Sequence, residues 1–177
     1  DYQADQSGSA TVTVTGTSNG QTVDDVFVVT VSAADDAPVV GNAIADVAVN
    51  EDDPDSTIDL ANVFDDVDDD NASITKAATS SNSSLVTVSV TGNVLTLDYQ
   101  ADQNGTATVT VTGTSNGLDA NDTFTVSVAP VDDPPVVALP LPDVSATEDD
   151  LDLAIDLSNV FNDVDDDNAS ITKTALS

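Results

Sequence analysis

Apolar and polar residues alternate over several stretches of this chain. The stretches 85–90, 107–112 and 123–128 carry mostly apolar residues at every second position, with Thr or Ser between them. A period of two places the apolar side chains on one face of a β-strand. A Gly-bearing turn at 91–93 leads into 94–97, which predicts a hairpin. Because no segment has a sustained helical period, we predict an all-β fold of two packed sheets.

The chain also contains an internal repeat. Residues 1–6 and 98–103 are both Asp-Tyr-Gln-Ala-Asp-Gln, and residues 62–64 recur as 159–161. Each copy lies 97 residues after the first (98 − 1 = 97), and 52 of the 80 overlapping positions are identical. A unit of this length matches one immunoglobulin-like Greek-key β-sandwich, so the sequence predicts tandem sandwich repeats.

Two Asp-Asp-X-Pro stretches are the natural joints between repeats, because Pro ends strands and stiffens linkers. With these joints, residues 37–133 form one complete repeat. Residues 1–36 are then the C-terminal part of a preceding repeat, and residues 134–177 are the N-terminal part of a following one, with strands expected at 136–144 and 155–157.

The two partial repeats leave two interpretations open. The sequence has no initiator Met and no signal peptide, so we expect a window from a longer array. The alternative is that the partial repeats complete each other between chains in a fibre. Together they lack a counterpart of residues 81–97, which favours the first interpretation.

The charge of the chain excludes several partners. It has 33 acidic residues against two lysines, no Arg and no His, for a net charge of -31. Nucleic acid is excluded because phosphate binding needs Lys and Arg, and no apolar run is long enough to insert into a membrane. A compact chain with this charge repels itself unless cations offset it. Solvation of an acidic surface is the alternative.

Four acidic groups recur in each repeat, and their side chains are candidate metal ligands. In the first copy they are Asp1, Gln3, Asp35, Asp36, Glu51, Asp66, Asp68 and Asp70, and in the second they are Asp98, Gln100, Asp132, Asp133, Glu148, Asp163, Asp165 and Asp167. Ca²⁺ takes six to eight oxygen ligands in irregular geometry, which suits carboxylates, amides and carbonyls at a joint. We expect Asp52, Asp53, Asp69 and the region of Asp119 and Asp122 to be solvated surface instead.

The order of these groups resembles the cadherin superfamily. Glu51 follows the first strand, and residues 97–100 (Leu-Asp-Tyr-Gln) resemble the acidic tripeptide in the middle of a cadherin repeat. Residues 132–135 resemble a shortened cadherin joint, and residues 163–165 resemble the Asp-X-Asp of the next repeat. The similarity covers the whole unit and is greatest to bacterial cadherin-like (dystroglycan-type) repeats of large surface adhesins.

This resemblance implies Ca²⁺ bound between neighbouring repeats and a location outside the cell or on its surface. Ala129 and Val131 stand where the family's joint has Asp and Asn side chains, and Gln100 replaces a Glu. The resemblance therefore implies fewer ions per joint than a full cadherin joint holds. The absence of Cys also fits a secreted bacterial surface protein.

Catalysis is not expected of this sequence. Without His, Cys or Arg it lacks the usual pairs of nucleophile and base, and two Tyr and four Phe do not line a sugar cleft. We predict a Ca²⁺-stiffened repeat array, as an adhesin stalk or a self-associating fibre. The alternative is a Ca²⁺-dependent module that binds carbohydrate or cell surfaces, with Tyr2 or Tyr99 as contacts.

Overall fold

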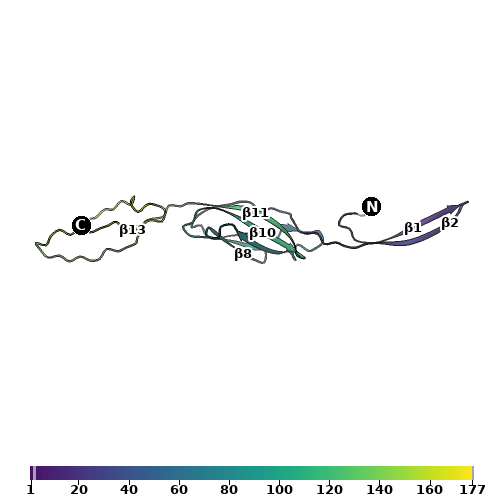
Figure 1. Cartoon of the computed structure of the whole chain (residues 1–177), viewed down its shortest axis with the longest axis horizontal. Coiled ribbons are helices and arrows are strands. Elements are labelled where there is room, and N and C mark those ends of the chain that lie inside the picture. Colours follow the sequence, from purple (N-terminus) through teal and green to yellow (C-terminus); the bar gives the residue numbers. More distant parts are fainter. Residues whose placement is uncertain (2, 177) are drawn as a thin grey trace.

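The computed structural model describes residues 1 and 3–176, and all the regular structure in this part is β. The molecule is elongated, with a hairpin at the N-terminal end, a sandwich in the middle and an extended segment at the C-terminal end (Figure 1). No helix in the described residues is long and apolar enough to cross a membrane. The strands are β1 (Gly8–Ser18), β2 (Gln21–Val31), β3 (Val39–Val40), β4 (Val47–Asn50), β5 (Ser56–Asp59), β6 (Phe64–Asp65), β7 (Thr75–Ser80), β8 (Val86–Thr91), β9 (Val94–Tyr99), β10 (Gly105–Ser115), β11 (Leu118–Ala129), β12 (Val136–Val137) and β13 (Phe161–Asn162).

The central sandwich is built from two main sheets. One sheet has the order β4-β11-β10-β7 and the other β5-β9-β8, while β3 and β6 form a short separate pair. All neighbouring strands are antiparallel except β4, which pairs in parallel with β11. Strand β4, near the start of the sandwich, therefore lies beside β11, at its end. Backbone hydrogen bonds between β4 and β11 connect the two ends of the sandwich.

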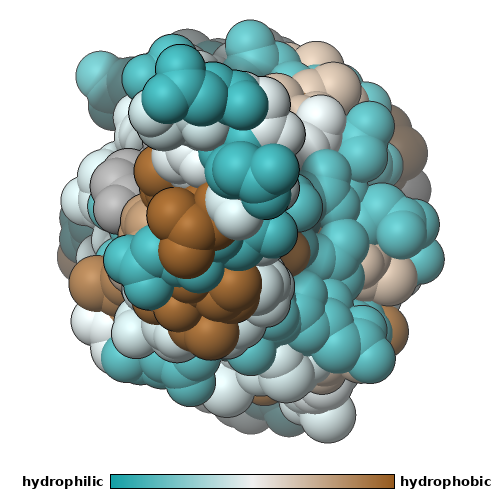
Figure 2. All heavy atoms as spheres, turned by 90° about the vertical axis from the view of Figure 1, so that its right-hand side faces the viewer, coloured by the Kyte–Doolittle hydropathy of each residue, from teal (hydrophilic) through white to brown (hydrophobic). Residues whose placement is uncertain are grey.

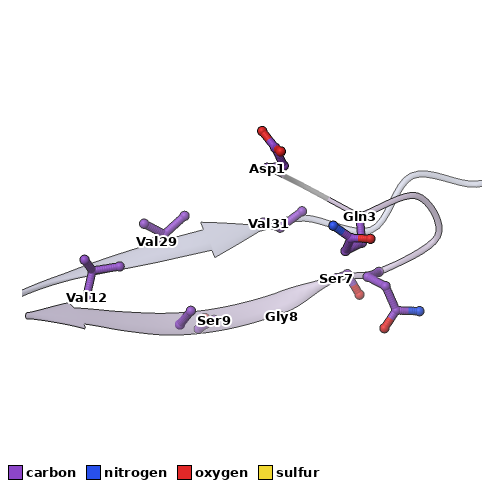
Figure 3. A pocket seen from close by; sticks show the side chains of 10 residues that line it. Asp1, Gln3, Ser7, Gly8, Ser9, Val12, Val29 and Val31 are labelled. Atoms are coloured by element: carbon purple, nitrogen blue, oxygen red, sulfur yellow. The ribbon is translucent and has the colours of Figure 1, made fainter.

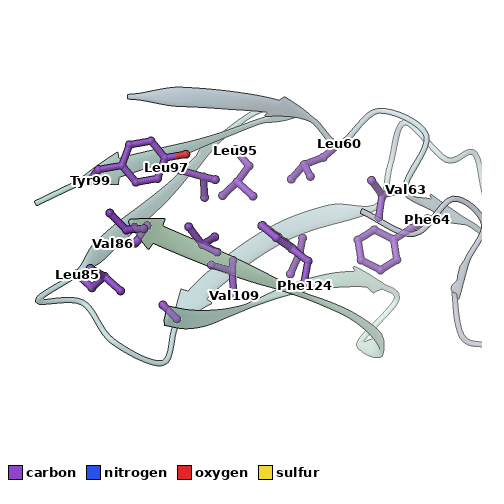
Figure 4. Close-up of a cluster of buried hydrophobic side chains, with 14 of the residues drawn as sticks. Leu60, Val63, Phe64, Leu85, Val86, Leu95, Leu97, Tyr99, Val109 and Phe124 are labelled. Atoms are coloured by element: carbon purple, nitrogen blue, oxygen red, sulfur yellow. The ribbon is translucent and has the colours of Figure 1, made fainter. Parts of the chain in front are cut away.

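The core between the sheets is made of aliphatic residues, two Phe rings and the ring of Tyr99. Leu60, Phe64, Leu95, Leu97 and Val109 are fully buried there, and Figure 4 shows them pointing between the two sheets. Val, Leu, Ile and Ala fill the rest because the sequence has so few aromatic residues. The sandwich thus buries one continuous hydrophobic cluster, as a folded domain requires.

A closely similar long hairpin occurs twice. In β1–β2, Gly8 pairs with Val31, and in β10–β11, Gly105 pairs with Val128, each 97 residues later (8 + 97 = 105; 31 + 97 = 128). Both hairpins turn at Asn-Gly with positive φ at both positions, the pair that a tight hairpin turn favours. In β10–β11 the inner face is buried in the core, whereas the inner face of β1–β2 is largely exposed.

The C-terminal segment forms less structure than expected. Only the pair β12–β13 is regular, so the strand expected at 155–157 does not form, and the stretch 136–144 is a strand only at its first two residues. The corresponding strands β4 and β5 in the sandwich pair with β11 and β9. No counterpart of β9 or β11 lies beside the described part of the C-terminal segment, so its backbone has no ladder to join.

Candidate cation sites at the repeat joints

Each joint is closed by the same hydrogen bond. The backbone N–H of Asp36 donates to Oδ2 of Asp68 at 2.8 Å, and that of Asp133 donates to Oδ2 of Asp165 at 2.7 Å. Both donors and both acceptors are 97 residues apart (36 + 97 = 133; 68 + 97 = 165). In both places the Asp-X-Asp loop therefore contacts the Asp-Asp-X-Pro linker that precedes it.

The acidic loop after β6 is shaped by its own side chains. Oδ1 of Asp66 accepts the N–H groups of Asp68 at 2.9 Å and Asp69 at 3.1 Å, and Oδ1 of Asn71 accepts the N–H of Asp66 at 2.9 Å. Asp and Asn side chains that bond nearby backbone groups fix tight loops in this way. The second copy makes the equivalent bonds from Asp163 and Asn168.

Two carboxylate oxygens at the joints are buried without a donor. They are Oδ2 of Asp66 and Oδ2 of Asp133, which have no hydrogen-bond partner among the described residues. Buried polar atoms are normally paired, so an oxygen left without a donor fits an additional ligand such as a cation.

Three carboxylates converge at the second joint. Asp52, Asp102 and Asp133 each place an oxygen within 4.8 Å of the other two. Asp52 and Asp102 are exposed and have positive φ values of 65° and 55°, a conformation that Asp tolerates better than most residues. Three like charges this close repel one another unless a cation neutralises them. The group is therefore the best candidate for a cation site in the described part of the chain.

Glu51 is buried at this joint and forms hydrogen bonds to residues on both sides of it. It is only 2% exposed, and its Oε1 accepts the N–H of Val131 at 2.7 Å. Its Oε2 accepts a longer bond from Nδ2 of Asn104 at 3.4 Å, and its own N–H donates to the carbonyl of Ala129 at 2.9 Å. Glu51 thus ties the end of β4 to the linker that leaves β11.

The electrostatics of both joints disfavour an additional negative charge. Partial loss of solvent raises the pKa of Asp133, and the carboxylates of Asp52 and Asp165 raise it further. The pKa of Asp36 is raised in the same way, by loss of solvent first and then by Asp68. In both joints, loss of solvent and the neighbouring carboxylates disfavour the ionised form of this Asp, and a bound cation would favour it.

Asp98 and Gln100, two of the predicted ligands, lie outside the three-carboxylate group. Oδ2 of Asp98 accepts the hydroxyl of Thr87 at 3.0 Å, and Oδ1 accepts Nε2 of Gln100 at 3.1 Å. Asp98 and Gln100 are thus bonded to each other, and Asp98 is exposed on β9. Their role as ligands stays a prediction.

The other predicted ligands are also spread along the chain. Oδ1 of Asp70 and Oδ1 of Asp167 each accept a backbone N–H two residues later, at 3.0 Å. Asp35 accepts a bond from Asn116 at 2.9 Å. Asp132 and Glu148 are exposed, and Asp1 and Gln3 line a hollow beside β1–β2.

The structure corrects two expectations of a solvated acidic surface. Asp122 is only 8% exposed, and its Oδ2 accepts the N–H of Ile44 at 2.6 Å, so it is a buried structural carboxylate. Oδ2 of Asp69 accepts the hydroxyl of Ser115 at 2.8 Å and Nδ2 of Asn116 at 2.7 Å. Both residues stabilise the sandwich through hydrogen bonds instead of merely solvating it.

Asp52 and Asp102 were not among the predicted ligands. The sequence contained one relevant signal for Asp102: this residue belongs to the hexapeptide that occurs at 1–6 and again at 98–103. Asp52 recurs as Asp149 in the second copy, but many other residues also recur, so recurrence alone does not mark Asp52 as a ligand. Only the fold shows that residues 50 positions apart (102 − 52 = 50) meet at the joint.

Comparisons with known proteins identify the fold. No family model and no curated protein sequence matches the chain. Among solved structures, extracellular cadherin domains 1–4 of protocadherin gamma B7 match with a TM-score of 0.52 and 18% identity, over 80% of this chain and 37% of that one. Domains EC1–2 of human protocadherin-24 match with a TM-score of 0.47 and 16% identity, over 75% of this chain and 70% of that one.

An enzyme is also among the matched structures. The endo-fucoidan hydrolase MfFcnA4 of glycoside hydrolase family 107 matches with a TM-score of 0.39 and 13% identity, over 71% of this chain. The chain spans only 19% of that enzyme's length. The protocadherin gamma B7 similarity shows that the fold is an all-β, cadherin-like sandwich, which confirms the predicted fold class.

Proposed function

We propose that this chain is part of an extracellular tandem array of cadherin-like repeats whose joints bind Ca²⁺ and stiffen when they do. The observation that carries the proposal is the convergence of Asp52, Asp102 and Asp133 at a joint, with the buried Oδ2 of Asp133 left without a donor. The sandwich is the complete repeat 37–133, and 1–36 and 134–177 belong to its neighbours. An array of this kind serves as an adhesin stalk or surface fibre, not as a catalyst.

The chemistry of the joint favours Ca²⁺ over Mg²⁺. The three carboxylates supply oxygen ligands, and the backbone carbonyls and waters of an open joint supply the remainder. Mg²⁺ requires a near-ideal octahedron and keeps most of its water, so this loosely arranged group suits it poorly. Weak extracellular Ca²⁺ modules bind at roughly 10⁻⁴–10⁻³ M, which is the range proposed here.

The first prediction concerns this site. Asp102→Asn removes one charged ligand, and we expect it to weaken Ca²⁺ binding by roughly tenfold or more, because a charge pair near a protein surface contributes about 1–4 kcal/mol. Isothermal titration calorimetry measures the affinity, and small-angle scattering with Ca²⁺ and with EDTA measures the change in maximum dimension.

The matched control is Asp24→Asn, which removes the same charge from an exposed position on β2. It should leave the affinity and the change in length as they are in the unchanged chain. If the unchanged chain neither binds Ca²⁺ nor changes its dimensions, the acidic residues are solvating surface and the proposal fails.

A glycan-binding role receives less support. Tyr99, the described aromatic residue considered for stacking on sugars, is only 8% exposed, and its hydroxyl lies 2.6 Å from that of Ser56. Tyr2 lies outside the described residues. A buried ring does not offer a stacking surface, so no observation favours this alternative.

A further inference from the structure

The tip of the β10–β11 hairpin carries a chemically reactive pair of residues. Asn116 is followed by Gly117, and Asn-Gly occurs at only two other places in the chain, 19–20 and 104–105. In such a pair the backbone nitrogen of Gly can attack the side-chain carbonyl of Asn, because Gly has no Cβ to obstruct the approach. The pair is therefore a candidate for spontaneous deamidation.

The turn places this nitrogen outside the strand ladder. Ser115 and Leu118 form the last pair between β10 and β11, so Gly117 lies beyond it. A Cβ added at Gly117 would meet no atom within 4 Å, so the space for a five-membered ring is open. Gly105, by contrast, pairs with Val128 inside the ladder, which holds its backbone in place. The turn at Asn116 and Gly117 thus has the room that ring closure needs.

The side chain of Asn116 is held by two carboxylates at the first joint. Its Nδ2 donates to Oδ1 of Asp35 at 2.9 Å and to Oδ2 of Asp69 at 2.7 Å. These two acceptors stand directly beside Asp36 and Asp68, whose hydrogen bond closes the joint. Deamidation expels Nδ2, so both bonds must break before the reaction can proceed. A closed joint therefore protects the amide, and an open joint releases it.

We propose that Asn116 is a deamidation site controlled by the first joint, and that its deamidation after opening prevents the joint from closing as before. The backbone nitrogen of Gly117 gives up its proton to solvent and attacks Cγ of Asn116. The new C–N bond closes a succinimide ring, and Nδ2 takes up a proton and leaves as ammonia. Water then opens the ring at either carbonyl, which gives aspartate or isoaspartate.

The product cannot rebuild the bridge. A carboxylate at position 116 donates no hydrogen bond, and it faces the carboxylates of Asp35 and Asp69 where the amide had faced two acceptors. Like charges at this spacing repel one another. The repulsion acts on the immediate neighbours of the bond between Asp36 and Asp68. The inference goes beyond the proposed function, because protein groups alone make the bridge and the reaction needs only water.

Asn19 provides an internal reference in the same chain. Asn19 and Gly20 form the same turn, with φ values of 49° and 79°, and a Cβ added at Gly20 also meets nothing within 4 Å. This tip lies at the end of the molecule that faces the viewer in Figure 2. Figure 3 shows the other end of the hairpin, where Ser7 and Gly8 lead into β1 and Val31 ends β2. The first joint follows that end, roughly 34 Å along the strands from the tip, so Asn19 reports the buffer and not the joint.

The first test compares deamidation rates in the full chain. The amide peaks of Gly117 and Gly20 in ¹⁵N NMR spectra follow both Asn residues in one sample, kept at mildly alkaline pH in EDTA. Asn116 should react more slowly than Asn19 in the unchanged chain. Asp35→Ala removes one acceptor, and we expect it to raise the rate of Asn116 relative to Asn19 by roughly fivefold or more, as the loss of one hydrogen bond implies.

Asp35→Asn is the matched control for this test. It removes the same charge but keeps an acceptor oxygen at the same place, so it should change the ratio of the two rates by less than about twofold. Equal effects of Asp35→Ala and Asp35→Asn would mean that charge, and not the bridge, sets the rate of Asn116.

The second test concerns the product. Asn116→Asp places the deamidated side chain at the tip, and Asn116→Gly removes the bridge without adding charge, at a positive φ that suits Gly. The carboxylate acceptor holds the amide proton of Asp36 at high frequency. This proton should move to lower frequency in Asn116→Asp, and less so in Asn116→Gly. The amide proton of Asp133, in the equivalent bond to Asp165, should stay in place in both variants.

Four results would overturn the proposal. They are an Asn116 that reacts as fast as Asn19 in the unchanged chain, equal effects of the two Asp35 substitutions, an Asn116 that stays intact in Asp35→Ala after Asn19 has reacted, and an Asp36 amide proton that does not move in Asn116→Asp. All measurements are made in EDTA. A chain that meets these expectations but fails to bind Ca²⁺ would refute the proposed function alone.

Discussion

Two kinds of carboxylate can be distinguished by whether they accept a hydrogen bond from the backbone or lie against other carboxylates. Glu51 and Asp122 are buried, and each accepts a short bond from a backbone N–H. Asp52, Asp102 and Asp133 converge on one another instead, and the buried oxygen of Asp133 has no donor among the described residues. The first kind stabilises the fold through its hydrogen bonds, whereas members of the second kind repel one another.

Substitution of Asp122 tests the first kind. Asp122→Ala leaves the N–H of Ile44 without its acceptor in a partly buried place, and we expect it to lower the free energy of unfolding by about 1–3 kcal/mol. Urea denaturation measures the loss. Asp25→Ala is the matched control, because Asp25 is the counterpart of Asp122 on the exposed hairpin, and its effect should be near zero. Equal effects of the two substitutions would refute the assignment.

The pKa of Asp133 tests the second kind. Its pKa is raised above the ordinary value of 3.8, so without Ca²⁺ the joint is most stable below that value and loses this contribution as pH rises through the raised pKa. Ca²⁺ favours the ionised carboxylate and should lower the pKa of Asp133 again. A carboxyl ¹³C NMR titration in EDTA and in Ca²⁺ measures both.

Asp156 serves as the internal reference for this titration. The backbone N–H and side chain of Ser158 lower its pKa, and Asp156 is not in the three-carboxylate group. Its midpoint should lie below 3.8 and change little with Ca²⁺. An Asp133 midpoint that is the same in EDTA and in Ca²⁺ would contradict a cation at the joint.

At the scale of single elements, the sequence correctly predicted strands β8 to β11 of the sandwich. The stretches 85–90 and 107–112 became β8 and the middle of β10, because their apolar faces find an opposing sheet. The stretch 155–157 has the same kind of sequence as β5 but forms no strand, because the described residues beside it include no counterpart of β9. A strand forms only where a neighbouring strand can share its backbone hydrogen bonds. The alternation of apolar and polar residues does not show whether such a neighbour is present.

The same limit applies to the candidate site. The contacts of Asp36 with Asp68 and of Asp133 with Asp165 follow from the repeat and its resemblance to cadherins. The approach of Asp102 to the joint depends on where β10 begins, and nothing in the local sequence marks that.

Gly113 in β10 provides a test at this scale. A Cβ added there would lie 2.7 Å from ring atoms of Phe64, whereas one added at its counterpart Gly16 meets nothing closer than 3.6 Å. We therefore expect Gly113→Ala to lower the free energy of unfolding of the sandwich by roughly 1–3 kcal/mol through overpacking, and Gly16→Ala to have no such effect. Thermal unfolding compares the two, and equal melting temperatures would show that the ring moves aside freely.

At the scale of the whole molecule, the β10–β11 hairpin runs from one joint to the next. At its tip, Nδ2 of Asn116 donates to Asp35 at 2.9 Å and to Asp69 at 2.7 Å, so it bridges the preceding linker and the acidic loop. At its other end, β11 leads through Ala129 into the linker that Glu51 holds.

This bridge predicts that Asn116 restrains the first joint. Asn116→Ala removes both bonds, and we expect a wider spread of orientations between the β1–β2 hairpin and the sandwich. Residual dipolar couplings measured by NMR report that spread. Asn19→Ala changes the counterpart at the tip of β1–β2 and should leave the couplings of the sandwich relative to the hairpin unchanged. Indistinguishable couplings for Asn116→Ala and the unchanged chain would refute the restraint.

The parallel pairing of β4 with β11 determines how the sandwich responds to mechanical load. Tension along an array enters the sandwich ahead of β4 and leaves it after β11. Because these two strands are parallel neighbours, the pull drives them in opposite directions along their axes, and all the hydrogen bonds between residues 47–50 and 126–129 are sheared together. The bond from Glu51 to Ala129 extends the same row. A stalk built from such units resists stretching because no single hydrogen bond can break first and unzip the rest.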